Sequence, residues 1–380
     1  MANINDYLEW RGDLSLRDYQ FNEIDSMILA RFSYLRFDKI KFNNGDTIKS
    51  ISKKMSNLDN DEFLYNGDKE LITNLGNSDR FNNMLITDYV NNSSKEIEKQ
   101  FGAITIHLNN DEMYVSFIGT DSTINGWKED LNMSFMENVP CQLDGKKYLE
   151  DIASKYPNKK IRIGGHSKGG NVAIYSAITV DSLIQDRIIK VDNYDGPGFN
   201  KKIVNQYGNS KIIKKIETYI PQDSVVGRIL YHKEKVSISY SNEKGIYQHD
   251  IYSWQVIKDK MIKSEKNTEN SENITKTINN WLETTTNEQR KIFIDSVFEL
   301  FYKTESNTFK EVSSNLGSNV LKILQEYSSI SKEDKRVITD MLKNMTKYYL
   351  TILKDNQTMK FENMKEHYKA ELEKTFKNKD

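Results

Sequence analysis

The sequence GHSKG, residues 165–169, places Ser167 in a G-x-S-x-G pattern between an apolar run, IRIG, and a small-residue run, GGNVAIYSA. A strand that turns sharply into a helix exposes such a serine as a nucleophile. Side chains at Gly165 or Gly169 would collide with the neighbouring strand or helix, and the amino terminus of the helix would favour developing negative charge. The pattern predicts that Ser167 is a catalytic nucleophile. The alternative is a glycine-rich connection in which the serine has no role.

A serine hydroxyl needs a general base at neutral pH, and the chain offers five histidines. His249, in QHDIYSW, follows the last predicted strand, where the base belongs when the chain order is serine, acid, histidine. His232, in ILYHKEK, is the alternative, and we favour His249. Of the other histidines, His107 is predicted to lie in the middle of a strand, and His166 to project away from Ser167. His367 is predicted to lie in a polar carboxyl-terminal helix.

The base needs an acidic residue that orients its ring and stabilises the imidazolium form. Asp223, in YIPQDSVVG, follows a predicted strand and precedes the histidine loop. Asp195, in NYDGPGF, ends the preceding predicted strand and competes for the role, whereas Asp250 adjoins His249 and is badly placed to reach its ring. We favour Asp223 over Asp195.

An oxyanion hole needs two backbone N–H donors. One is expected from Lys168, the residue after the nucleophile. The second is expected from the segment FIGTDSTINGW, where a strand ends at Ile118 and the chain turns at Gly119. We select the amide of Thr120, whose hydroxyl would brace the turn. The alternative is an ordinary turn before a helix.

Strands and helices must alternate to position these residues. Residues 1–45 have helical spacing of apolar positions, and residues 46–98 are polar and predict short helices and loops. GAITIHL and EMYVSFIG, separated by Asn109-Asn110-Asp111, predict a β-hairpin. From there to EKVSISYS, alternating strands and helices predict a mostly parallel sheet covered by helices, an α/β fold over residues 1–262.

The end of the chain has a different character. Residues 263–277, KSEKNTENSENITKT, have almost no apolar content and predict a linker. Residues 278–380 predict an all-helical region, with Ser331 and Asp334 as a capping box. Two helical faces are predicted within it, the first from Ile294, Val297, Phe298 and Phe301, and the second from Ile338, Met341, Leu342, Met345, Tyr349 and Ile352.

Composition limits the classes of function. The 380 residues carry a formal charge of −1, from 54 basic and 55 acidic side chains, so no global field attracts nucleic acid or anionic lipid. One cysteine, Cys141, excludes an internal disulfide. A polar amino terminus and the lack of a long apolar run predict a cytoplasmic protein. The histidines lack metal-ligand spacing and no phosphate- or dinucleotide-binding motif is present, so we expect no metal and no cofactor.

Three of these segments resemble motifs of the fungal-type (class-three) lipases within the α/β-hydrolases. FIGTDSTINGWKEDL is similar to their F-R-G-[ST]-x-S-x-x-N-W-x-x-D-L segment, GGHSKGGNVA to G-H-S-L-G-G-A-x-A, and IPQDSVVGRIL to N-D-x-V-P-R-L-P. The resemblance implies roles for Thr120, Ser167, Asp223 and His249. Ile118 replaces the family's arginine, and Lys168 replaces a leucine, which would put a charge beside the acyl pocket.

The chain also resembles a bacterial lipase-like family with a domain of unknown function, the Mbeg-like group, from residue 6 to about 255. The segments that carry this resemblance are YLEWRGDLSL, FNEIDSMILARFSYLRFD, GTDSTINGWKEDLNMSF, GGHSKGGNVAIYSA, DGPGF and QHDIYSW. The resemblance implies the α/β-hydrolase fold and leaves the substrate open.

The leading hypothesis is a serine esterase or lipase-like hydrolase that acts on a small-molecule ester or lipid through an acyl-enzyme. An acyltransferase would use the same residues. A non-catalytic binding or assembly module is the second class, motivated by the helical region, which could contact a protein partner, a second copy or a membrane surface.

Overall fold

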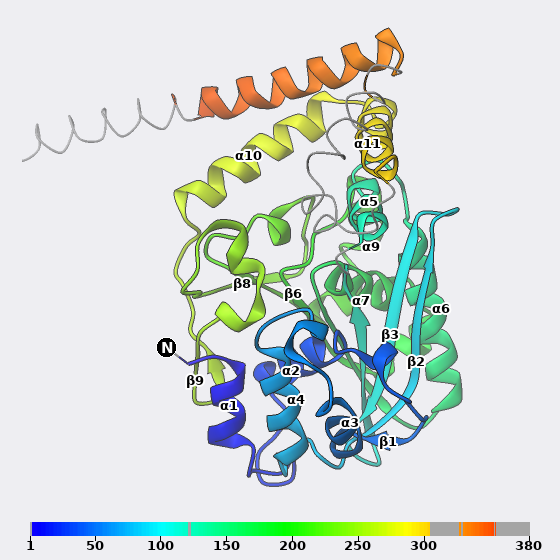
Figure 1. The fold of residues 1–380 in the computed structure, drawn as a ribbon, viewed down its shortest axis with the longest axis vertical. Helices are drawn as coiled ribbons and strands as arrows, with labels where there is room; N and C mark the ends of the chain where they lie inside the picture. The colour runs from blue at the N-terminus through cyan, green and yellow to red at the C-terminus, as the bar shows by residue number, and fades with distance from the viewer. Residues whose placement is uncertain (1, 121–122, 305–326, 328–329, 353, 355–380) are drawn as a thin grey trace, which may run out of the picture.

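An eight-stranded sheet forms the centre of the molecule in the computed structural model (Figure 1). The structure describes residues 2–120, 123–304, 327, 330–352 and 354. The strands lie side by side in the order of the sequence: β1 (Asp46–Thr47), β2 (Leu85–Ser94), β3 (Lys99–His107), β4 (Glu112–Ile118), β5 (Lys160–His166), β6 (Ile188–Tyr194), β7 (Ile216–Pro221) and β8 (Lys235–Ser239). A separate two-stranded ribbon contains β9 (Val256–Ile257) and β10 (Lys260–Met261).

The sheet changes direction at β4. Strands β1 to β4 pair antiparallel, whereas β4 to β8 pair parallel. The predicted hairpin is confirmed as β3 and β4, with Thr105 opposite Val115. The mostly parallel sheet is also confirmed. Strand β2, within the stretch predicted to hold short helices and loops, was missed because its polar second half lacks a clear apolar alternation.

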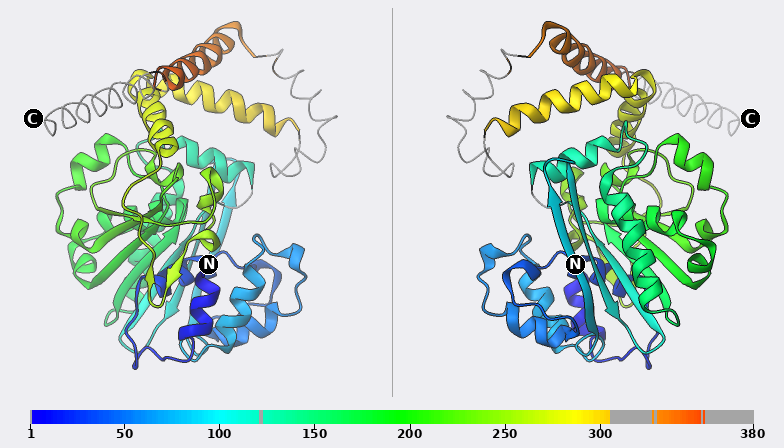
Figure 2. Two further views of the ribbon diagram at one scale, coloured as in Figure 1. Left: turned by 90° about the vertical axis from the view of Figure 1, so that its left-hand side faces the viewer. Right: turned by 90° about the vertical axis from the view of Figure 1, so that its right-hand side faces the viewer.

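Helices cover both faces of the sheet (Figure 2). The amino-terminal helices lie on one face, where α2 contacts β4, β5 and β6, and α6 and α7 lie on the other. The helices up to β8 are α1 (Ile4–Arg11), α2 (Glu23–Phe32), α3 (Ile48–Met55), α4 (Asp68–Asn77), α5 (Ile124–Asn132), α6 (Pro140–Lys155), α7 (Lys168–Thr179), α8 (Ser182–Arg187) and α9 (Lys201–Tyr207).

The alternation of side chains along β4 divides the core into two layers. Met113, Val115 and Phe117 are buried with α6 and α7, whereas Tyr114 points to the opposite layer. There its hydroxyl donates to the Ser26 carbonyl of α2 at 2.9 Å. A one-residue shift would exchange these faces, so burial on both sides fixes the register of the strand.

The buried guanidinium of Arg80 attaches the amino-terminal segment to the body. Its Nε donates to Asp25 Oδ1 at 2.7 Å, and its Nη2 pairs with Asp25 Oδ2 at 2.5 Å, with both side chains inaccessible to solvent. Its Nη1 donates to the carbonyls of Leu14 and Tyr19, each at 2.9 Å. The guanidinium of Arg80 thus joins helix α2 and the loop before it to the segment that precedes β2.

The predicted linker is wrong from residue 269 onward. Helix α10 (Glu269–Thr284) begins there and is followed by α11 (Asn287–Tyr302), at the end of the molecule opposite α1 and α3 (Figure 1). Thr268 caps α10, and its amide donates to the Gln222 carbonyl at 2.7 Å. Polar side chains of this segment cap the helix and attach it to the body of the protein. The low apolar content therefore does not mean that the segment is a solvated linker.

The helical region after α11 is described in part. Residues 332–352 are helical, and the Asp334 amide donates to Ser331 Oγ at 3.0 Å, which confirms the amino-terminal cap. The predicted apolar faces are buried at Ile294 and Phe298 and at Ile338, Met341 and Ile352, but Leu342 is exposed. His367 lies outside the described residues.

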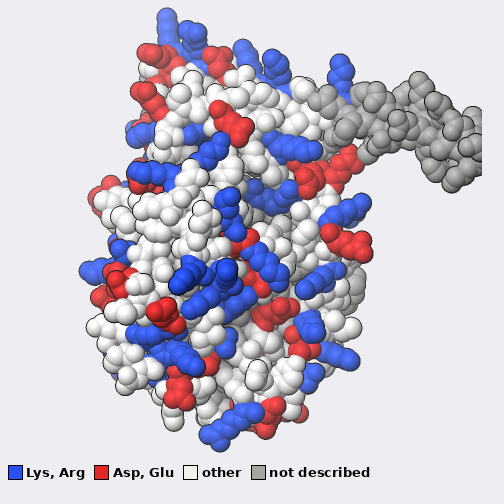
Figure 3. Space-filling model, turned by 180° about the vertical axis from the view of Figure 1, so that it is seen from behind, with Lys and Arg blue, Asp and Glu red and all other residues white. Residues whose placement is uncertain are grey.

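The surface carries both signs of charge. Lysine, arginine, aspartate and glutamate side chains are interspersed over the face drawn in Figure 3, as the near-zero net charge leads us to expect. No helix within the described residues is both long and apolar enough to cross a membrane.

Replacing Arg80 by leucine should destabilise the fold by about 3–5 kcal/mol, because Asp25 would be left as an unpaired buried charge. Urea unfolding followed by circular dichroism measures this change. Arg336→Leu, which breaks an exposed pair with Asp340 in the carboxyl-terminal helix, is the matched control and should leave the midpoint unchanged. Equal midpoints for Arg80→Leu and wild type would contradict the structural role of the buried pair.

Candidate active site

Ser167 occupies a strained turn between β5 and α7. Its φ of 57° and ψ of −134° lie in a region that residues with a side chain rarely adopt. Its amide donates to the Tyr194 carbonyl at 2.9 Å, which fixes the turn against the end of β6. The serine side chain is half-buried at the amino terminus of α7, where free N–H groups favour negative charge.

The two glycines of the pattern permit this turn. A Cβ at Gly165 would lie 2.3 Å from the carbonyl carbon of Gly169, and a Cβ at Gly169 would lie 2.2 Å from the Phe117 carbonyl oxygen. Both contacts are with backbone, which cannot move aside as a flexible side chain can. The predicted collisions with strand and helix are therefore confirmed.

Four candidate residues follow the carboxyl ends of parallel strands. Ser167 follows β5, Asp195 follows β6, Asp223 follows β7 and His249 lies in the loop after β8. Carboxyl ends of parallel strands meet at one edge of the sheet, which is where open α/β sheets bind ligands. The topology therefore places all four on the same edge.

His249 is paired with Asp195 and not with Asp223. The His249 Nδ1 lies 2.6 Å from Asp195 Oδ2, and the carboxylate is almost fully buried. Asp195 Oδ1 accepts from Ser224 Oγ at 2.5 Å and from the Gly227 amide at 3.1 Å. A left-handed backbone at Asp195, with a φ of 52°, turns the chain at the end of β6.

The preference for Asp223 as the partner of the histidine is thus wrong in this geometry. Asp223 accepts from the Gly245 amide at 2.5 Å, from the hydroxyl of Thr268 and from Asn270. It joins the loop after β7 to the start of α10 and to the loop that carries His249. Both aspartates follow strands, and the sequence holds no signal for which carboxylate reaches the imidazole.

His232, the alternative base, belongs to a separate pair. Its Nδ1 lies 2.7 Å from Glu234 Oε1, which also accepts from Thr218 Oγ1 at 2.5 Å. Burial opposes ionisation of Glu234, but the hydrogen bonds from His232 and Thr218 outweigh it and lower the pKa of Glu234 to about 2. His232 is therefore held by a carboxylate other than the two candidate acids.

His166 contacts His249, a contact that the sequence did not predict. The two ring centroids are 4.5 Å apart, and His166 Nε2 donates to the His249 carbonyl at 2.8 Å. Burial lowers the pKa of His166 well below its ordinary value, so the ring is neutral at physiological pH. Since His166 precedes Ser167, this contact places the His249 ring beside the serine turn.

A buried tryptophan holds the loop that carries His249. Trp254 is fully buried, and its Nε1 donates to the Gln248 carbonyl at 2.8 Å. Gln248 in turn accepts from the Asp223 amide at 2.8 Å through its side-chain oxygen. The aromatic residue near the histidine thus has a positioning role that its place in QHDIYSW did not reveal.

The turn at Gly119 and Thr120 packs directly against the serine turn. A Cβ at Gly119 would lie 1.9 Å from the Tyr34 hydroxyl, 2.5 Å from the His166 carbonyl oxygen and 3.1 Å from the Gly169 amide. The Thr120 hydroxyl donates to the Asp130 carboxylate on α5, which agrees with the expectation that it braces the turn.

The Lys168 side chain is buried in an ion pair, whereas the sequence led us to expect its charge beside the acyl pocket. Its Nζ is buried, 2.9 Å from Glu129 Oε2 and 2.6 Å from Gln100 Oε1. Burial disfavours the ammonium form, but Glu129 outweighs this effect and raises the pKa of Lys168 above its ordinary value. Glu129 therefore neutralises the Lys168 charge inside the protein. The backbone amide of Lys168 is the first of α7.

Metal ligands do not cluster in the part of the chain that the structure describes. No group of three or more His, Cys, Asp or Glu side chains there could hold a metal ion. The side chains that the structure brings together at this edge of the sheet include Ser167 and the pair of His249 with the buried Asp195 carboxylate.

The strand order, the strained serine between strand and helix, and the residues at the carboxyl edge define an α/β-hydrolase fold of the lipase-like type. The chain belongs to the Mbeg1-like family, whose model matches residues 75–299. The matched range continues beyond residue 262 through α10 and into α11.

Fungal lipase structures resemble the chain only weakly. A mutant of MDLA from Penicillium cyclopium is 14% identical, with 64% of this chain and 86% of that chain covered and a TM-score of 0.39. Lipase II from Rhizopus niveus is 11% identical, with 60% and 76% covered and a TM-score of 0.35. No curated protein matches the sequence. Likenesses of this size carry no argument about activity.

Asp130→Asn should change the pH dependence of stability. Burial raises the pKa of Asp130 from 3.8 to about 6, against opposing effects of Lys168 and Thr120. A carboxyl whose pKa is higher in the folded state contributes stability below about pH 4, and this contribution is lost as the pH rises through about 6. The unfolding free energy of Asp130→Asn should therefore increase relative to wild type between pH 4 and pH 7. A pH-independent difference in urea unfolding would contradict it.

Proposed function

We propose that the protein is a serine hydrolase that cleaves a carboxylic ester through an acyl-enzyme. The observation that carries the proposal is the buried Asp195 carboxylate bonded to His249 Nδ1, at the same sheet edge as the strained Ser167 turn. In this assignment Ser167 is the nucleophile, His249 is the general base and Asp195 orients the imidazole.

The pairing at Nδ1 leaves the other ring nitrogen of His249 to act as the base. The carboxylate of Asp195 favours the tautomer with the proton on Nδ1, so Nε2 carries a lone pair that accepts the Ser167 proton. Ser167 Oγ then attacks the ester carbonyl, and the imidazolium returns its proton to the departing alcohol. Water, activated in the same way, releases the acid and restores the serine.

Two backbone amides are assigned to the oxyanion. The Lys168 amide begins α7 directly after the nucleophile, and the Thr120 amide belongs to the turn that packs on the serine turn. The buried ion pair between Lys168 and Glu129 supports this role, because it keeps the ammonium group away from the reacting carbonyl. The negative charge that develops would meet N–H dipoles held in place before the substrate binds.

Ser167→Ala should abolish covalent labelling of the protein by a fluorophosphonate probe. Hydrolysis of p-nitrophenyl butyrate should fall roughly a thousandfold or more in kcat, because the covalent step is lost. Fluorescence of the labelled band and absorbance of p-nitrophenol measure the two effects. Wild type that labels no better than Ser167→Ala would exclude the enzymatic assignment and favour a non-catalytic module that retains the fold.

Asp195→Asn should reduce kcat by up to about ten-thousandfold, because an amide no longer enforces the productive tautomer of His249. Asp223→Asn makes the same chemical change one strand further along the sheet, and it should reduce kcat less than Asp195→Asn, because Asp223 holds the histidine loop through Gly245 but does not contact the imidazole. Steady-state hydrolysis of p-nitrophenyl butyrate compares the two variants. A larger loss for Asp223→Asn than for Asp195→Asn would return the acid role to Asp223.

A further inference from the structure

Gln100, near the start of β3, connects the two sides of the candidate oxyanion hole. It is buried, with 2% of the residue exposed. Its Oε1 accepts from Lys168 Nζ at 2.6 Å, and its Nε2 donates to the Gly119 carbonyl at 3.3 Å. Because an ammonium group can only donate, the contact with Lys168 fixes which end of the amide faces Gly119. One side chain thus joins the residue after the nucleophile to the turn that carries the Thr120 amide.

The ammonium group of Lys168 makes two of its bonds to Gln100. An ammonium group has three donors. Lys168 Nζ lies 2.6 Å from Gln100 Oε1, 3.0 Å from the Gln100 carbonyl oxygen and 2.9 Å from Glu129 Oε2. The same Glu129 oxygen accepts from the Gln100 amide at 2.9 Å. The buried ion pair therefore bonds the N–H, the carbonyl and the side-chain oxygen of Gln100, which holds the glutamine in one orientation.

The bond from Gln100 to Gly119 sets the direction of the Thr120 N–H. The Gly119 carbonyl and the Thr120 N–H belong to one peptide group, which is planar and trans, so they point in opposite directions. Strands β3 and β5 lie on opposite sides of β4. A carbonyl held by a residue of β3 therefore turns the N–H toward the side of β4 on which β5 and Ser167 lie.

The other contacts of the turn do not replace this bond. The Thr120 hydroxyl donates to the Asp130 carboxylate, but this bond holds the side chain and not the peptide group. Gly119 offers little resistance of its own to rotation of the peptide, because glycine adopts many backbone conformations readily. Among the residues that the structure describes, Gln100 is the one that donates to the Gly119 carbonyl.

We propose that Gln100 is a positioning residue of the oxyanion hole, which orients the Thr120 amide, and that Lys168 holds Gln100 in place. This role rests on the proposed hydrolase function. A hydrogen bond to the carbonyl of a peptide group also polarises the group and strengthens its N–H as a donor. Lys168 then contributes to the hole twice, by its own amide and, through Gln100, by the orientation of the second amide. The role gives a reason for a lysine where the fungal-type lipases have a leucine.

A purely structural role of Gln100 has a different kinetic consequence. Gln100 joins β3 to the start of α7, so its loss lowers the unfolding free energy in either role. An oxyanion is stabilised more in the transition state than in the ground state, so a misdirected N–H lowers kcat and leaves KM unchanged. The division of the effect between kcat and KM therefore separates the two roles.

Gln100→Met tests the proposal, because methionine has a similar shape but no N–H to donate to Gly119. Its kcat for p-nitrophenyl butyrate should fall about tenfold to a hundredfold, up to the loss that removal of one oxyanion donor causes, with KM unchanged. An alkyl trifluoromethyl ketone forms a tetrahedral adduct with the serine and mimics the transition state. Its affinity should fall by the same factor as kcat/KM. A structural role would leave this affinity unchanged in the folded protein.

Gln185→Met is the matched control. Gln185, in α8, likewise donates from its Nε2 to a backbone carbonyl, that of Ala177 at 2.9 Å. This contact lies at the carboxyl end of α7, whereas Ser167 lies at the amino end. The control should have the kcat, the KM and the ketone affinity of wild type.

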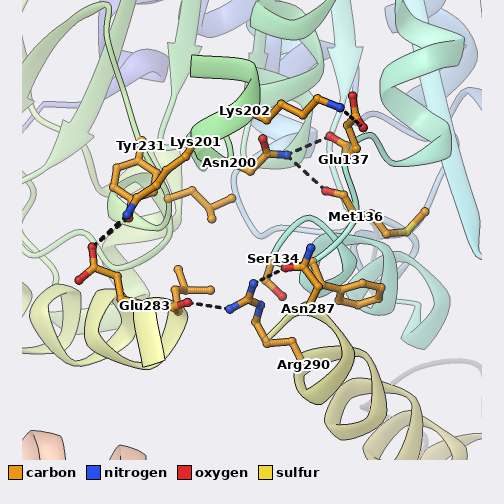
Figure 4. A pocket seen from close by; sticks show the side chains of 13 residues that line it. Ser134, Met136, Glu137, Asn200, Lys201, Lys202, Tyr231, Glu283, Asn287 and Arg290 are labelled. Carbon is orange, nitrogen blue, oxygen red and sulfur yellow. Dashed lines mark hydrogen bonds and ion pairs between the residues drawn. The ribbon is translucent and has the colours of Figure 1, made fainter. Parts of the chain in front are cut away.

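Neither substitution changes the pocket of about 420 Å³ between the hydrolase body and helices α10 and α11 (Figure 4). The described residues that line this pocket include neither Gln100 nor Gln185. Gln100 instead lines a cavity of about 200 Å³, together with Tyr34 and Ile118. A rise in KM with unchanged kcat would make Gln100 a substrate-binding residue of that cavity and would overturn the positioning role.

Gln100→Asn decides the question if Gln100→Met does not fold by circular dichroism. It keeps a polar amide and the backbone bonds, but it is one methylene too short to reach Lys168 and Gly119 together. Its kcat should fall with KM unchanged. An active wild type whose kcat survives the substitution of Gln100 overturns the positioning role and leaves the hydrolase function standing. A wild type that neither hydrolyses the ester nor reacts with a fluorophosphonate overturns both.

Discussion

The close approach of three backbone segments at the serine turn is the constraint on which the rest of the site depends. Gly169 lies against the Phe117 carbonyl of β4, Gly165 lies against Gly169, and Gly119 lies against the His166 carbonyl. Each contact is too short for a Cβ, so the end of β4, the end of β5 and the start of α7 are fixed relative to one another. The positive φ of Ser167 is sustained because these contacts hold the turn from both sides.

Buried polar groups inside the protein hold the same three backbone segments together. The cation of Lys168 is matched by Glu129, which also accepts from the amides of Gln100 and Cys141, each at 2.9 Å. These bonds join α5, β3, α6 and the start of α7 beneath the oxyanion turn. A buried pair of this kind adds little net stability over apolar packing, but removal of one partner is costly, so it enforces one arrangement of the elements.

Local patterns in the sequence were sufficient for the serine turn, the hairpin, the parallel strands and the loop that carries His249. They failed where the outcome depends on distances across the sheet. Asp195 and Asp223 both follow strands at the same edge, and only the left-handed turn at Asp195 and its contacts with Ser224 and Gly227 bring a carboxylate to the imidazole. The contact of His166 with His249 likewise arises between segments 83 residues apart.

The position of Asp223 explains why the carboxyl-terminal helices are part of the same unit. Its carboxylate accepts from Gly245 in the segment leading to His249 and from Thr268 at the cap of α10, and its amide donates to Gln248. One buried residue therefore connects the loop after β7, the histidine loop and the first turn of α10. The same carboxylate therefore joins the start of α10 to the segment that leads to the histidine loop. The polar segment 263–277, which contains the first half of α10, is thus part of the structure at the sheet edge of the candidate site, and its low apolar content misled the prediction of a linker.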